Sequence, residues 1–120
     1  MDIEKANRWN RFIEEICYKD LSELNKTQRM AVLCFWYDVE MGNGGFSGYK
    51  DCYPDTDSEE LREALAAVGT QDLADNYWEA FTIGEYDGWE KTDNEYYDLF
   101  PSLFDCLAEF VEKNKDEIFT

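Results

Sequence analysis

The sequence contains no histidine, and this absence removes the most common tools of enzyme chemistry. The 120 residues hold no imidazole to act as a general base near neutral pH, to bind a metal, or to activate a nucleophile. Cys17, Cys34, Cys52 and Cys106 form no C-x-x-C pair, so a zinc site is disfavoured and we expect free thiols. Paired carboxylates can perform acid–base chemistry, but nothing selects one pair from 28 acidic residues. We therefore expect no enzymatic activity, no catalytic residue, no metal and no cofactor.

Long apolar runs are also missing. No stretch approaches the roughly 18 apolar residues of a membrane-spanning helix. The first twelve residues lack the apolar core of a signal peptide. We therefore expect a cytoplasmic protein without membrane association, and the length predicts a single domain over residues 1–120.

Basic residues are scarce, and the scarcity is regional. The chain has 28 acidic and 11 basic residues, a net charge of −17. Residues 1–50 are close to neutral, with eight acidic and seven basic residues, and residues 113–120 balance. Residues 51–112, called the acidic block here, hold eighteen acidic residues and only Arg62 and Lys91 as bases. This charge disfavours direct contact with nucleic acid or an anionic membrane. A disordered acidic chain is excluded by the 17% of aromatic residues.

The spacing of apolar residues predicts an all-α fold, a compact single-domain bundle of about six helices. Apolar residues recur at steps of three and four through most of the chain, and no alternation flanked by hairpin turns is present. We expect helix caps at Asn25 or Thr27, and at Asp57, Thr70 and Thr92.

Glycine and proline indicate where helices break. Gly42 is expected to end the second helix, and the glycines after it form a turn into a short helix through Phe46 and Tyr49. Pro101 is expected in the first turn of a last helix that runs to about Phe119, with Phe100 on its apolar face.

The acids of the block fall in rows opposite the apolar faces. Asp105, Glu109 and Glu112 share one face of the last predicted helix, and Asp72, Asp75 and Glu79 share one face of an earlier helix. Carboxylates one turn apart are separated by about 5–6 Å, comparable to phosphates along a DNA strand. Lysine at i+4 is nearly absent, although like charges at this spacing destabilise a helix. We predict a partner-binding acidic surface made of Asp55, Asp57, Glu59, Glu60, Glu63, Asp72, Asp75, Glu79, Glu85, Asp87, Asp105, Glu109 and Glu112.

Three segments carry a family resemblance. They are Glu40-Met-Gly-Asn-Gly-Gly-Phe-Ser-Gly-Tyr49, then residues 63–75 with Ala-Leu-Ala-Ala-Val-Gly, then the aromatic and acidic residues 94–100. Over residues 21–118 the chain resembles the bacterial family of domains of unknown function typified by DNA mimic protein nineteen. The resemblance implies a compact helical domain whose acidic surface occupies the DNA-binding face of a helix-turn-helix transcription regulator. It also implies a structural role for Asn43, Gly44, Gly45 and Phe46.

The leading hypothesis is a DNA mimic that blocks a basic DNA-binding protein without touching nucleic acid itself. One alternative is an immunity-type inhibitor that caps a toxin or nuclease through an acidic-aromatic patch around Tyr86 and Trp89. Another is a helical domain whose charge serves solubility. The sequence leaves the oligomeric state open, and a homodimer would double the charged row.

Overall fold

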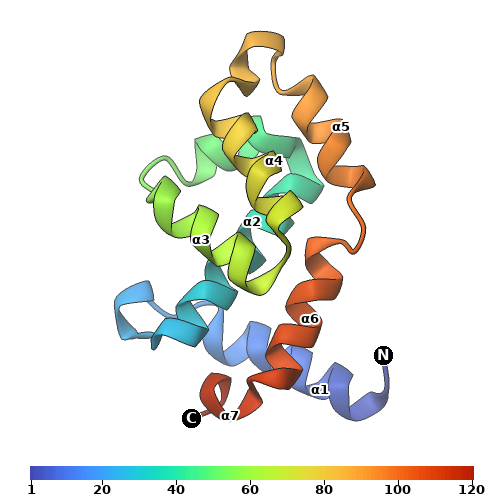
Figure 1. The fold of residues 1–120 in the computed structure, drawn as a ribbon. Helices are drawn as coiled ribbons and strands as arrows, with labels where there is room; N and C mark the ends of the chain where they lie inside the picture. Colours follow the sequence, from blue (N-terminus) through green and yellow to red (C-terminus); the bar gives the residue numbers. More distant parts are fainter.

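The computed structural model describes residues 1–120 and contains helices and turns without a strand, which confirms the expected all-α fold (Figure 1). The elements in chain order are α1 (Ile3–Arg11), a π-helical turn (Phe12–Ile16), a 3₁₀ turn (Leu21–Glu23), α2 (Lys26–Cys52), α3 (Ser58–Val68), α4 (Gln71–Thr82), the 3₁₀ turn η3 (Gly84–Asp87), α5 (Glu90–Asp98), α6 (Leu103–Lys113) and α7 (Lys115–Ile118). None of these helices combines the length and hydropathy needed to span a bilayer.

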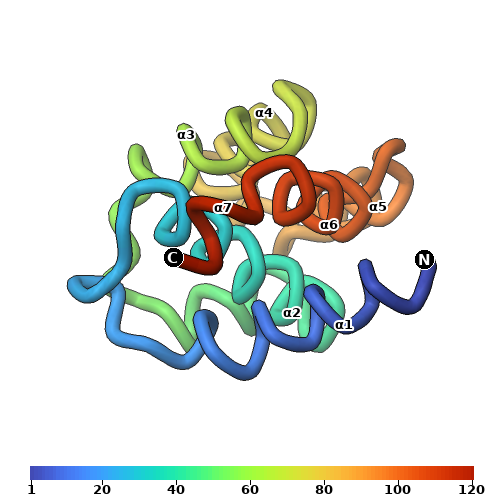
Figure 2. The backbone as a smooth tube through the Cα atoms, turned by 90° about the horizontal axis from the view of Figure 1, so that it is seen from below, coloured from blue at the N-terminus to red at the C-terminus, as the bar shows by residue number.

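The long helix α2 organises the molecule, because α3, α5, α6 and α7 all contact it. Seen from below, α3 and α4 lie on one side and α1 and α2 on the other, with α6 and α7 between them (Figure 2). Tyr37 of α2 is fully buried at the centre. Its ring makes edge-to-face contacts with Tyr49, Tyr77 and Tyr96, at centroid distances of 4.9, 5.4 and 5.8 Å. These contacts join both halves of α2 to α4 and α5.

Most of the helix starts are where the sequence predicts them. Asn25 caps α2 in a reciprocal capping box with Gln28. Asp57 accepts a hydrogen bond from the Glu60 N–H, and Thr70 accepts one from the Leu73 N–H. Each cap satisfies a backbone donor that has no partner within its helix.

The prediction that Gly42 ends the second helix is wrong. The helix continues through Gly42 and Gly44, and the backbone leaves helical geometry only at Gly45, with φ 69° and ψ −164°. The Phe46 N–H that the break releases donates a 3.1 Å hydrogen bond to the Asp93 carboxylate. The break therefore lies where a distant acid can satisfy the exposed amide, which the local sequence does not reveal.

Three predictions about the C-terminal third are also wrong. Thr92 does not cap a helix: α5 begins at Glu90, after Gly88 and Trp89 adopt left-handed geometry, and Thr92 is buried within it. Pro101 precedes the cap residue Ser102 rather than sitting inside α6, so Phe100 projects from the connection and is 92% exposed. The last helix is divided at Asn114 into α6 and α7.

The break at Gly45 gives a direct stability prediction. A Cβ there would lie 2.2 Å from an Asp93 carboxylate oxygen, in a backbone region almost restricted to glycine. Gly45→Ala should lower the free energy of unfolding by about 2–4 kcal/mol, from backbone strain and the displaced carboxylate. The measurement is urea unfolding followed by circular dichroism.

The matched control is Gly42→Ala. Gly42 is helical, and apart from its chain neighbours and the backbone of its own helix no atom lies within 4 Å of the point that an added methyl group would take. This substitution should raise stability by about 0.5–1 kcal/mol, because alanine is the better helix former. Equal effects at the two glycines would contradict the assigned break.

Candidate functional site: an acidic surface over α3, α4 and α6

The predicted surface residues come from five parts of the chain. Asp55 and Asp57 lie in the connection before α3, whereas Glu59, Glu60 and Glu63 lie on α3. The remaining acids lie on three elements: Asp72, Asp75 and Glu79 on α4, Glu85 and Asp87 on η3, and Asp105, Glu109 and Glu112 on α6. All are exposed except Glu60, Glu79 and Glu112, which are half-buried. The two helices α3 and α4, which carry six of these acids, contact each other (Figure 1).

The structure corrects the expectation that these charges are uncompensated, because four of the carboxylates form ion pairs. The Arg8 guanidinium donates two hydrogen bonds to the Glu112 carboxylate, with N–O distances of 2.8 and 2.5 Å. Lys5 pairs with Glu109, and Arg29 pairs with Glu60. The three bases come from the nearly neutral N-terminal part, so counting charges by segment could not reveal these pairs.

The two bases inside the acidic block contact side chains of neighbouring helices. Lys91 binds the carboxylates of Glu79 and Glu95, at 2.5 and 2.8 Å, and so joins α4 to α5. The Arg62 guanidinium lies 4.2 Å from the centre of the Trp78 ring, a cation–π contact between α3 and α4. Lys91 therefore neutralises one acid of the predicted surface, Glu79, and Arg62 forms no ion pair.

Nine acids of the predicted surface are exposed and have no basic side chain bound to them. These residues form no ion pair and are exposed, and we call them the unpaired carboxylates: Asp55, Asp57, Glu59, Glu63, Asp72, Asp75, Glu85, Asp87 and Asp105. Most belong to the α3–α4 pair and the turns next to it. The α6 row is weaker than predicted, because only Asp105 of its three acids is unpaired.

Two other carboxylates have raised pKa values but structural roles. Burial raises the pKa of Asp38, which accepts a 2.5 Å hydrogen bond from the Tyr96 hydroxyl. Burial also raises the pKa of Asp93, whose carboxylate holds the Phe46 N–H. Raised carboxylate pKa values can mark acid–base catalysts, but each of these groups already serves a fixed partner inside the fold.

The remaining candidate chemistry is limited. The four cysteines are free, and Cys34 is fully buried, which raises its thiol pKa well above the ordinary value. No group of three or more Cys, Asp or Glu side chains is arranged to hold a metal ion. The signature residues separate into two environments: Asn43 and Gly44 are exposed, whereas Gly45 and Phe46 are buried.

Comparison with known families gives one match. The model of the DMP19-like protein family matches residues 22–114, so the chain belongs to that family. No curated protein and no solved structure matches the chain. The matched range contains α2 to α6 and hence every acid of the predicted surface.

The ion pair between α1 and α6 predicts a pH-dependent stability difference. Hydrogen bonding to Arg8 lowers the Glu112 pKa below the ordinary glutamate value of 4.5. The pair therefore contributes fully above that value, and its contribution is lost as the pH falls through the lowered pKa. Arg8→Met should destabilise the protein at pH 7, and the difference from wild type should shrink at acidic pH.

Lys19→Met is the control, because it also removes one positive charge but breaks no ion pair. Denaturant unfolding of the three proteins from pH 7 to pH 3 makes the comparison. A constant difference between Arg8→Met and wild type across this range would contradict the assigned pair.

Proposed function

We propose that this member of the DMP19-like family is a non-enzymatic binding protein that mimics DNA and occupies the DNA-binding face of a basic DNA-binding protein. A helix-turn-helix transcription regulator is the partner that the resemblance to DNA mimic protein nineteen implies. It would act in the cytoplasm, where bacterial regulators meet DNA. The supporting observation is the set of unpaired carboxylates on and beside α3 and α4, none of which pairs with Arg62 or Lys91.

A basic DNA-binding groove recognises the negative charge of the phosphates. Affinity for DNA comes largely from neutralising phosphates and releasing counterions. Carboxylates held on helices present a comparable negative field, and they lose less conformational freedom on binding than a disordered acidic chain would. A rigid acidic surface can thus compete with DNA while carrying no base sequence.

The retention of charge also supports a binding role. The fold uses Lys5, Arg8, Arg29 and Lys91 to neutralise acids that join helices. The unpaired carboxylates of α3 and α4 have no such partner: Glu59, Glu63, Asp72 and Asp75. A surface selected for stability or solubility alone would gain from mixed charges, since solubility needs a net charge of only about 2–8.

The experiment is binding to a panel of helix-turn-helix regulators from the same organism, measured against salt. Affinity should fall steeply between about 50 and 200 mM salt. The triple variant Glu63→Gln, Asp72→Asn, Asp75→Asn should bind about threefold to one-hundredfold more weakly, because exposed charge pairs contribute roughly 0.2–1 kcal/mol each. It should also show a shallower salt dependence.

The matched control changes three exposed acids outside the block: Glu4→Gln, Glu14→Gln and Glu23→Gln. It has the same net charge as the first triple and should bind within about a factor of two of wild type if each contact is local. Affinity independent of salt, or an equal loss from both triples, would contradict DNA mimicry.

An immunity-type inhibitor is the second candidate, and the tip at η3 favours it. Tyr86 is 99% exposed and lies between the acids Glu85 and Asp87, next to Ile83, which is 65% exposed. Exposed aromatic residues of this kind carry disproportionate binding energy in protein interfaces. If Tyr86→Ala abolishes binding while the acidic triple has no effect, this candidate replaces the DNA mimic.

A further inference from the structure

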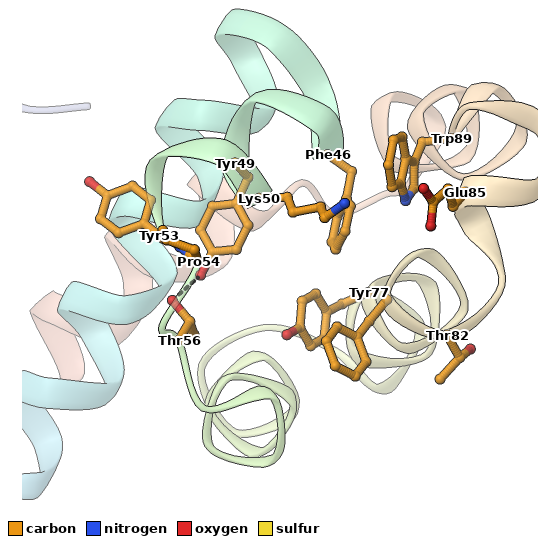
Figure 3. A pocket seen from close by; sticks show the side chains of 11 residues that line it. Phe46, Tyr49, Lys50, Tyr53, Pro54, Thr56, Tyr77, Thr82, Glu85 and Trp89 are labelled. Carbon is orange, nitrogen blue, oxygen red and sulfur yellow. Dashed lines mark hydrogen bonds between the residues drawn. The ribbon is translucent and has the colours of Figure 1, made fainter.

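An aromatic pocket lies between the second half of α2, α4, η3 and the start of α5 (Figure 3). Its volume is about 210 Å³. Phe46, Tyr49, Tyr77, Phe81 and Trp89 form its walls, and Lys50 and Glu85 supply its charged groups. Phe46, Tyr49 and Tyr77 also belong to the buried core, whereas Phe81 and Trp89 are partly exposed at the pocket.

The walls are preformed because the rings support one another. Phe46 lies between its neighbours, with centroid distances of 5.8 Å to Trp89, 6.0 Å to Tyr77 and 6.1 Å to Tyr49. The Trp89 indole N–H donates a 3.0 Å hydrogen bond to the Ala80 carbonyl, and the Tyr49 hydroxyl donates one of 3.0 Å to Thr56. A ligand would therefore meet fixed ring faces and lose little affinity to reorganisation.

The size of the pocket limits its occupant. Pockets for drug-sized ligands usually measure about 300–1,000 Å³. A cavity of about 210 Å³ is small for a nucleotide or a flavin, but it can receive a single long side chain.

Lys50 indicates which chemistry the walls attract. Its ammonium lies 5.3 Å from the centre of the Trp89 ring and forms no ion pair, although the Glu85 carboxylate lines the same pocket. In Figure 3 the Lys50 side chain extends across the pocket towards Phe46. Electron-rich ring faces bind cations, most strongly at tryptophan. The chain's own lysine thus occupies a position that suits a cation.

The electrostatic surroundings favour a cation from outside as well. Glu85 is exposed beside the pocket, and Asp55, Asp57 and Asp87 lie on the segments next to it. This field attracts a positive group and repels an anion. Lys50 is the one opposing charge in the pocket, and its exposed, flexible side chain can move into solvent.

We propose that this pocket receives an arginine side chain of the basic partner, which displaces Lys50 from Trp89. Arginine fits better than lysine, because its flat guanidinium stacks on aromatic faces and is more weakly hydrated. DNA-binding faces also supply arginine, the residue that most often contacts guanine. The proposal rests on the proposed function for the identity of the partner, and it adds a specific anchor to a diffuse charge attraction.

The test uses the intact protein without a partner and the probe Nα-acetyl-arginine amide. Binding is followed by NMR through the Trp89 indole N–H, which Trp89→Phe identifies. The control probe is the citrulline analogue, which keeps the shape but has no charge. The arginine probe should shift the Trp89 signal and bind about threefold to thirtyfold more tightly than citrulline, the range expected for a cation–π contact.

Two substitutions test whether the pocket prefers a cation to an anion. Lys50→Met should tighten binding of the arginine probe severalfold by removing the competing cation, and Glu85→Gln should weaken it. Lys26→Met removes the same charge at the far end of α2 and should leave the affinity within a factor of two of wild type. Its comparison with Lys50→Met separates a local effect from a change in net charge.

Several results would overturn the arginine pocket. These are equal binding of the citrulline and arginine probes, weaker arginine binding after Lys50→Met, or no Trp89 shift at about 100 mM probe. Tighter binding of benzoate would assign the pocket to an anion, and tighter binding of tetramethylammonium would assign it to a quaternary amine.

Failure of this proposal is distinguishable from failure of DNA mimicry. If the arginine probe does not bind while regulator binding still depends on salt and on the acidic triple, the pocket proposal is wrong and DNA mimicry is still supported. If the probe binds but no regulator does, the cation preference stands, whereas the assignment to an arginine of a DNA-binding partner is overturned.

Discussion

The backbone break at Gly45 is the constraint on which the rest of the structure depends. It divides α2 into two helical parts, and the Asp93 carboxylate accepts the amide hydrogen that the break exposes at Phe46. The change of direction brings Phe46 towards the ring of Tyr77 on α4 and Tyr49 towards the ring of Tyr37. Without the break, a straight α2 would carry these side chains along one axis, and α4 and α5 would lose the aromatic surface on which they pack. A side chain at position 45 would collide with the carboxylate that stabilises the break.

Ion pairs that do not involve the break at Gly45 compensate part of the acidic charge. A block with eighteen acidic residues and two bases resists compaction, since like charges repel. Bases from the N-terminal part reduce this repulsion, because they form ion pairs with Glu60, Glu109 and Glu112. Compensation is thus concentrated where helices meet, and the exposed acids of α3 and α4 keep their field. An acidic surface and a stable fold are compatible here because they use different carboxylates.

Local signals predicted the helices well, and long-range contacts account for the errors. Asn25 and Thr70 are recognisable as caps because each serves an amide a few residues away. The choice of Gly45 over Gly42 depends on Asp93, which lies 47 residues from Phe46 along the chain. The pairing of Arg8 with Glu112 spans 104 residues, so no periodicity could have revealed it.

The same reason explains what the sequence missed at the candidate site. The acids were identifiable by composition, but their division into paired and unpaired sets required the fold. The family resemblance implies a structural role for Phe46, whereas its place in a pocket wall depends on Tyr77 and Trp89 from distant segments. The aromatic content of the acidic block was the available signal, although it could not distinguish core from cavity.

In the proposed function, the unpaired carboxylates and DNA compete for one basic face. The most direct measurement is fluorescence anisotropy of a labelled operator duplex bound to its helix-turn-helix regulator, titrated with this protein. A DNA mimic should release the duplex in full, and the concentration needed for half-release should rise in proportion to added duplex. A ternary complex, or a bound duplex that persists at saturating protein, would contradict it.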